Sequence, residues 1–201
     1  MYDIHNKTLL KEDLDASRFS IKSLGVVFSN RFNPEEFAKI KSKTKANVFA
    51  AVELKPKSAG ELKEQVKRNR KNVDVILVDA TDVQIARAAA QMSDVDVISH
   101  AFVDQPTARD AAKNNVALEI NLKDILQVYG MKRAILISKI NFNLKLARKY
   151  KTPLVITTGA ESIYDMRSPK QIMIFMEAIG FKHDEAKKAI FTTPKKIVEK
   201  R

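Results

Sequence analysis

Short apolar runs alternate with longer polar and amphipathic stretches along the whole chain. Seven of these runs have the length and the β-branched residues of strands, and they cover residues 2–5, 24–28, 47–54, 73–79, 95–100, 116–121 and 154–158. Most show no strict alternation of polar and apolar positions, which is typical of parallel strands covered on both faces. The pattern therefore predicts a parallel sheet buried between other elements.

Helix signals fill the intervals between these strands. Asn33 and Pro34 start a helix that continues to residue 40, and Ser58 caps a helix that turns Leu62 and Val66 inward. On the exposed sides of that second helix we expect Lys63, Lys67, Arg68, Arg70 and Lys71. Further helices are predicted at residues 82–92 after a Thr81 cap, 122–129 ended by Gly130, 135–150, 170–179 after Ser168 and Pro169, 184–191 and 195–200.

The alternation of strands and helices without a linker predicts one α/β domain over residues 1–201. An open doubly wound sheet usually has a glycine-rich first turn, and none of the five glycines forms a G-x-G arrangement. Most predicted strands instead end near a polar residue: His5, Ser29, Glu53, Asp79, His100, Asn121 and Thr158. Such a ring is typical of a TIM-barrel-like (β/α) barrel. At 201 residues we expect a compact or imperfectly closed barrel with about seven parallel strands.

Composition excludes several classes of protein. No apolar run approaches the roughly 20 residues that cross a bilayer, and the first residues do not resemble a signal peptide, so we expect a cytoplasmic protein. Without cysteine the chain has no disulfide, no thiolate metal site and no thiol nucleophile.

The net charge of +12 is unevenly distributed. Lys and Arg outnumber Asp and Glu by 10 to 3 in residues 41–72 and by 16 to 6 in residues 132–201, whereas residues 73–131 have 4 against 9. Two basic blocks thus flank an acidic middle. A solvated lysine-rich surface would give such a pattern, but so would a surface that neutralises nucleic-acid phosphates, which is the interpretation that we favour.

Two long blocks resemble the archaeal ribonuclease P protein component 3 family. One is NVALEINLKDIL at residues 115–126, and the other runs from LARKY at residues 146–150 through residues 153–160 to DMRSP at residues 165–169. The resemblance implies a TIM-barrel-like protein subunit of ribonuclease P, the ribonucleoprotein endonuclease that removes 5′ leaders in tRNA processing. In this family the RNA subunit is catalytic with Mg²⁺. The implied partners are that RNA, other protein subunits and precursor tRNA, and we expect no catalytic residue, metal or cofactor in this chain itself.

We select ten candidate RNA-binding residues from their positions relative to the predicted strands and helices and from the blocks that resemble the family. Aromatic residues make up only 7% of the chain, so we expect cations to clamp the RNA backbone rather than rings to stack on bases. The candidates are Lys55, Lys57, Lys63, Arg87, Lys123, Lys145, Arg148, Arg167, Lys187 and Lys196. Arg167 stands out because it lies between a strand and a capped helix, where a guanidinium can bind phosphate with two hydrogen bonds. A structural alternative pairs Arg167 with Asp165 or Glu161.

Two other functions stay open. Asp3, His5, Glu53, Asp79 and His100 are candidate ligands of a metal-dependent hydrolase, although the chain has three histidines and no H-x-H or H-E-x-x-H motif. We favour Asp3 and His5 as hydrogen-bonded groups that close the barrel mouth. No G-x-S-x-G motif supports a serine nucleophile. A protein scaffold without RNA contact is the third possibility, because the acidic residues 73–131 would suit a basic partner.

Overall fold

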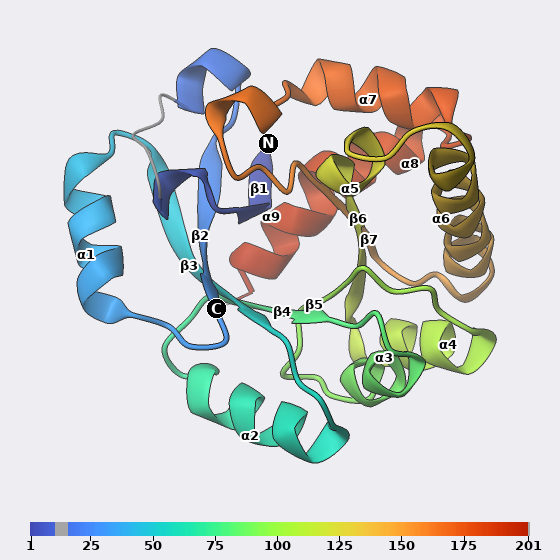
Figure 1. The fold of residues 1–201 in the computed structure, drawn as a ribbon, viewed down its shortest axis with the longest axis horizontal. Coiled ribbons are helices and arrows are strands. Elements are labelled where there is room, and N and C mark those ends of the chain that lie inside the picture. Colours follow the sequence, from blue (N-terminus) through green and yellow to red (C-terminus); the bar gives the residue numbers. More distant parts are fainter. Residues whose placement is uncertain (11–15, 201) are drawn as a thin grey trace.

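Seven parallel strands form one sheet in the order β1-β2-β3-β4-β5-β6-β7, and the sheet curls into a nearly closed barrel (Figure 1). The computed structural model describes residues 1–10 and 16–200. The strands are β1 (Tyr2–Asn6), β2 (Ser23–Ser29), β3 (Asn47–Leu54), β4 (Val75–Asp79), β5 (Val97–Ser99), β6 (Ala117–Asn121) and β7 (Leu154–Thr157). The fold predicted from the sequence is confirmed.

The first and last strands meet without a regular ladder among the described residues. Lys7 N donates to Ala160 O at 2.8 Å, and Thr158 N donates to Asp3 Oδ1 at 3.0 Å. A side-chain carboxylate thus replaces part of the missing ladder. The barrel is imperfectly closed, as its short length predicts.

The described parts of the chain contain nine α-helices: α1 (Pro34–Lys43), α2 (Ala59–Asn69), α3 (Val83–Ala90), α4 (Gln105–Asn114), α5 (Leu122–Leu126), α6 (Gly130–Tyr150), α7 (Pro169–Ala178), α8 (His183–Lys187) and α9 (Thr193–Val198). Short 3₁₀ turns lie at Thr8–Leu10, Ala16–Phe19 and Ile163–Asp165, and a π turn at Lys188–Thr192 joins α8 to α9. The predicted caps Asn33, Ser58 and Ser168 each accept a backbone N–H of their helix. None of the helices in residues 1–10 and 16–200 has the length and apolarity needed to span a membrane.

Three local predictions were wrong. The cap of α3 is Asp82 rather than Thr81, because the Asp82 carboxylate reaches the N–H groups of Gln84 and Ile85. Gly130 begins α6 instead of ending α5, and its φ of +56° suits a residue without a side chain. Arg70 is buried rather than exposed, since its guanidinium binds Asp96 and the carbonyl of Val73.

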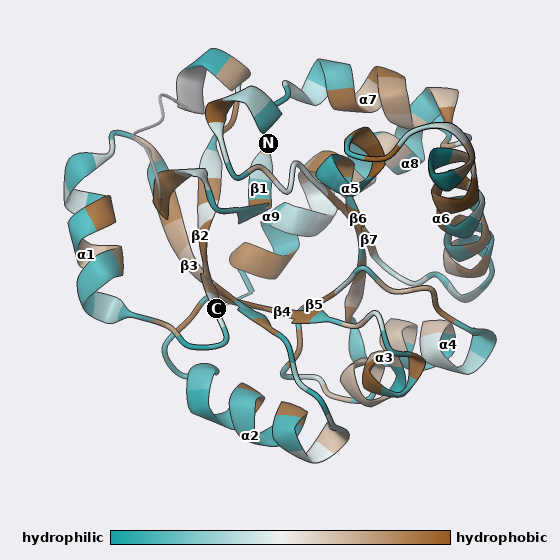
Figure 2. Cartoon of the chain, in the orientation of Figure 1, coloured by the Kyte–Doolittle hydropathy of each residue, from teal (hydrophilic) through white to brown (hydrophobic). Residues whose placement is uncertain are grey.

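The core has an inner and an outer part. All seven strands send apolar side chains to the inner cluster, which includes Ile4, Val27, Leu77 and Val155. Ile197 of α9 packs against it from the side where the strands begin, and Tyr2 donates to Glu199 Oε1 at 2.9 Å. Outside the barrel, α2, α3 and α4 pack on the other faces of β3 to β6, and α2 is mostly hydrophilic in Figure 2. The inner core stops before the strands end, which leaves polar positions at the barrel mouth.

Candidate functional site

A buried ion pair lies at the centre of the barrel mouth. His5 Nδ1 of β1 is 2.9 Å from Glu119 Oε1 of β6, and His5 Nε2 is 3.7 Å from Glu53 Oε1 of β3. Thr157 also donates to Glu119 Oε1, at 2.6 Å, and Lys7 Nζ lies 2.7 Å from Glu53 Oε2. Each charged group therefore has a partner, as buried ionised groups require.

A second set of ion pairs continues toward the solvent. His100 Nε2 lies 3.2 Å from Asp124 Oδ2 and His100 Nδ1 lies 3.6 Å from Asp79 Oδ1. Its backbone φ is +58°, an uncommon conformation for a histidine, and its ring centroid is 6.3 Å from that of His5. Lys55 Nζ bridges Glu53 Oε2 at 3.5 Å and Asp79 Oδ2 at 3.4 Å. The two sets form one network through Glu53 and Asp79.

The pKa values of this network favour its charged form. Burial by itself would lower the pKa of His5, but Glu119 and Glu53 outweigh burial and raise it. Burial opposes ionisation of Glu119, yet His5 holds the pKa of Glu119 at about 2. The carboxylates of Asp124 and Asp79 raise the pKa of His100 to about 10. With both imidazoles protonated, four cations face four carboxylates: His5, Lys7, Lys55 and His100 against Glu53, Glu119, Asp79 and Asp124.

Part of this network has the composition of a metal site. Ligand atoms of Glu53, Asp79 and His100 lie within 4.8 Å of one another. However, the Lys55 ammonium contacts both carboxylates, and an imidazole must be neutral to bind a metal, whereas the pKa of His100 is about 10. These residues suit an internally neutralised ion network better than a resident metal ion.

Asp3, Asn121 and Thr158, which are also predicted at the mouth, have structural contacts. Asp3 is buried and accepts hydrogen bonds from Thr158 and Asn6, and burial raises its pKa. Asn121 caps α5 by accepting from Lys123 N at 3.0 Å. The loop after β7 passes so close that a Cβ at Gly159 would lie 2.0 Å from Asn121 Oδ1. Asp3 is therefore not part of the Glu53–Asp79–His100 group.

Sequence reasoning missed Glu119, Lys7 and Asp124 as members of the network. One feature of the sequence could have identified Glu119. It is an ionisable residue inside an apolar strand, two positions before Asn121 and therefore on the same face of that strand. Lys7 and Asp124 lie just after strands, and no local pattern distinguishes them from solvated charges.

Nine of the ten predicted RNA-binding residues fall into two groups. Carboxylates pair with four of them: Lys55, Arg87 with Asp104, Lys123 with Glu161 and Arg148 with Glu185. Five others are exposed lysines for which no acidic partner lies within 4 Å in residues 1–10 and 16–200: Lys57, Lys63, Lys145, Lys187 and Lys196. Only this second group presents its full charge to a ligand.

The tenth, Arg167, stabilises its own loop. Its Nη1 donates to Tyr164 O at 2.6 Å and to Met166 O at 2.7 Å. Asp165 instead accepts from the N–H groups of Glu161 and Ser162, so the pairing of Arg167 with Asp165 or Glu161 is not the contact observed. The side chain is half-buried. Two carbonyl oxygens thus restrict the guanidinium beside the start of α7.

Exposed cations crowd the sector formed by α1 and α2, which lie next to each other around the barrel (Figure 1). Residues 39–71 contain one exposed acid, Glu64. The exposed bases of these residues, apart from the ion-paired Lys55, are Lys39, Lys41, Lys43, Lys45, Lys57, Lys63, Lys67, Arg68 and Lys71. We call these nine residues the α1–α2 basic face.

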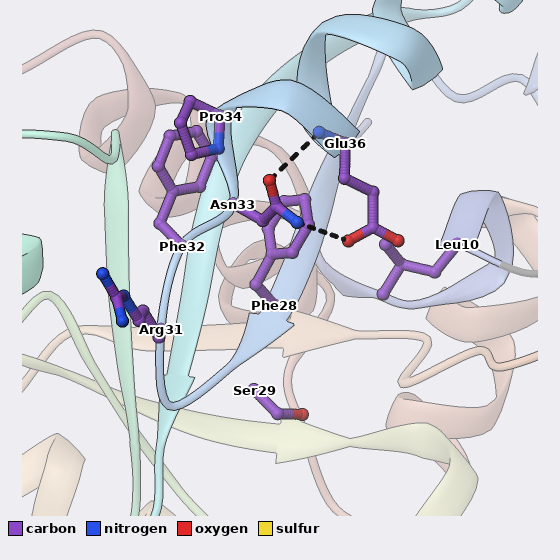
Figure 3. Close-up of a pocket in the computed structure, with 8 residues that line it drawn as sticks. All are labelled: Leu10, Phe28, Ser29, Arg31, Phe32, Asn33, Pro34 and Glu36. Carbon is purple, nitrogen blue, oxygen red and sulfur yellow. Dashed lines mark hydrogen bonds between the residues drawn. The ribbon is translucent and has the colours of Figure 1, made fainter.

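A pocket of about 600 Å³ opens beside the start of α1 (Figure 3). Phe28 and Phe32 form part of its wall and Leu10 lies across from them. Its polar residues Asn33 and Glu36 bond to each other, because Asn33 Oδ1 accepts from Glu36 N at 3.2 Å. Arg31 also lines the pocket, but none of the eight charged residues of the mouth network does, so the pocket is separate from that network.

The fold and these sites define a single-domain (β/α)-barrel protein with an ion-paired mouth and a basic outer surface. The sequence model of RNase P subunit p30 matches residues 11–201. The chain belongs to this family.

Curated relatives carry the name ribonuclease P protein component 3. The protein of Methanosarcina mazei is 38% identical over 159 residues, which are 76% of this chain and 66% of that protein. The protein of Methanosarcina barkeri is 33% identical over 184 residues, 88% of this chain and 77% of that protein. Among solved structures, a chain in the cryo-EM structure of archaeal ribonuclease P with mature tRNA has a TM-score of 0.84 and 28% identity, over 98% of this chain and 88% of that chain. The family resemblance seen in the sequence blocks is confirmed.

Proposed function

We propose that this chain is a protein subunit of ribonuclease P, in which it binds and supports the RNA subunit during removal of 5′ leaders from precursor tRNA. Membership of the p30 family and the similarity to a chain of an archaeal ribonuclease P support this assignment. Its partners are then the ribonuclease P RNA, other protein subunits and, through the complex, precursor tRNA.

The main observation that supports RNA binding is the α1–α2 basic face. Lysines on neighbouring turns of α2, such as Lys63 and Lys67, are spaced to follow a phosphate backbone and have no carboxylate within 4 Å in the described residues. Such contacts recognise the shape and charge of a folded RNA and carry little sequence information. The chain would therefore hold RNA structure in place.

Catalysis is assigned to the RNA subunit with Mg²⁺, and the isolated chain is expected to be inactive. The ion network at the mouth supports this view because Lys55 already pairs with Glu53 and Asp79, two of the three groups that would have to bind the metal of a hydrolase. A metal-dependent hydrolase is therefore the less favoured function.

Salt dependence of RNA binding tests the proposal. The logarithm of affinity should fall with the logarithm of salt by about 0.7–0.9 for each phosphate contact. The double variant Lys63→Ala/Lys67→Ala should reduce the slope by about 1.4–1.8. The matched control Arg109→Ala/Lys113→Ala removes two exposed bases from α4 in the acidic segment and should leave the slope unchanged. A flat salt response of the unaltered protein would favour a scaffold without RNA contact.

A further inference from the structure

Helix α6 has apolar residues on two opposite sides. Ile140, Leu144 and Ala147 face the core and are buried. At about 100° per residue, Met131, Ile135 and Phe142 lie within about 40° of one another on the other side of the helix. Their exposed fractions are 75%, 51% and 43%. An exposed surface helix normally has one apolar stripe, so the second stripe calls for a partner.

Neighbouring loops enlarge this second stripe. The ring of Phe102, from the loop after β5, packs 5.2 Å from that of Phe142 and is itself 44% exposed. Tyr129, just before α6, is 77% exposed. In Figure 1, α6 has the barrel on one side and no other element against its outward side. We call Phe102, Tyr129, Met131, Ile135 and Phe142 the outward stripe.

Only positive charges border the outward stripe on α6. The helix contains six Lys and Arg residues and no Asp or Glu. Arg133 binds the carbonyls of Ile125 and Val128, and Arg148 pairs with Glu185. Lys132, Lys139, Lys145 and Lys149 are exposed and have no carboxylate within 4 Å among the residues that the structure describes. A partner of complementary character has apolar residues at its centre and acids around them.

We propose that the outward stripe docks another protein subunit of the same ribonucleoprotein, through an apolar surface bordered by Asp and Glu. The choice of partner rests on the proposed function. Met131 and Ile135 favour a protein over RNA, because their aliphatic side chains neither stack on bases nor donate to phosphate, whereas the rings of the stripe would suit either partner. A second copy docked helix to helix would set two cationic helices against each other.

Binding of the purified full chain to separate components tests this assignment. The ribonuclease P RNA and each of the other archaeal ribonuclease P protein subunits are titrated in turn. The variant Met131→Ser/Ile135→Ser should bind one protein subunit at least tenfold more weakly while its affinity for the RNA is unchanged. Lys132→Glu/Lys139→Glu should weaken the same interaction. Ile174→Ser is the matched control, because Ile174 is 61% exposed on α7, outside the stripe, and it should bind like the unaltered chain.

Three outcomes would overturn the assignment: equal affinities of the double serine variant and the unaltered chain for every protein subunit, a loss confined to RNA, or a loss of self-association measured by sedimentation. Because the replaced side chains are exposed, melting temperatures should stay the same and exclude unfolding as the cause. Failure of the proposed function looks different, since the unaltered chain would then not bind the ribonuclease P RNA.

Discussion

His5 and Glu119 form a buried ion pair between the first and sixth strands, with His5 Nδ1 2.9 Å from Glu119 Oε1. The two residues are 114 positions apart in the sequence, so the pair joins distant parts of the barrel. We infer that this pair serves the barrel structure, and the predictions about the mouth depend on that view.

Glu119→Gln should lower the free energy of unfolding by about 1.5–3 kcal/mol, the range for a hydrogen bond to a charged group, because His5 keeps only Glu53 at 3.7 Å. Urea denaturation measures the change. A double-mutant cycle with His5→Gln should show that the two losses are not additive, as expected for residues in contact. Additive losses would mean that the two side chains do not interact.

Protonation of His100 should make stability depend on pH. Its pKa is about 10 in the folded protein against the usual 6.5, so its stabilising contribution is complete below about pH 6.5 and is lost as the pH rises toward 10. Urea unfolding from pH 6 to pH 10 should therefore show a shrinking difference between the unaltered protein and His100→Asn. Asparagine tolerates the φ of +58° better than most residues, so the two proteins should differ in the charge at position 100 rather than in backbone strain. A difference that does not change with pH would contradict the raised pKa.

Arg167→Ala should weaken ribonuclease P reconstitution by about 1.5–3 kcal/mol if the guanidinium also binds phosphate. Its Nη1 is already held by two loop carbonyls, so the group is positioned before RNA binds. Arg167→Lys should recover part of the loss, and Lys200→Ala should change little because that lysine is exposed near the chain end. Melting temperature is measured beside precursor tRNA cleavage at limiting protein. A loss of activity that only follows a loss of stability would assign Arg167 to loop structure alone.

The isolated protein should not cleave precursor tRNA with Mg²⁺ or Mn²⁺, whereas the complex with the RNA subunit should. The reason is the ion network, in which Lys55 contacts both Glu53 and Asp79. A folded His5→Asn/His100→Asn variant should likewise support cleavage by the complex. Stoichiometric bound metal together with metal-dependent cleavage by the pure chain would reverse this view.

Local features of the fold were predictable from the sequence because they depend on neighbouring residues. Strand β3 has the predicted bounds Asn47–Leu54, and Asn33, Ser58 and Ser168 cap their helices through side chains three residues from the N–H that they accept. The end of α5 and the start of α6 were harder to predict, because a glycine with a positive φ, such as Gly130, is found both after the end and at the start of helices.

The sequence by itself determined a parallel barrel, a ring of polar strand ends and two basic blocks, since periodicity and composition are properties of the chain. Only the tertiary structure decided which charges are neutralised. Arg70, Arg87 and Arg148 look like free cations in the sequence, but each meets a carboxylate from a distant segment, Asp96, Asp104 and Glu185. The outward stripe of α6 was likewise hidden, because whether Met131 and Ile135 are buried depends on what packs against each side of the helix, and a linear pattern does not contain that information.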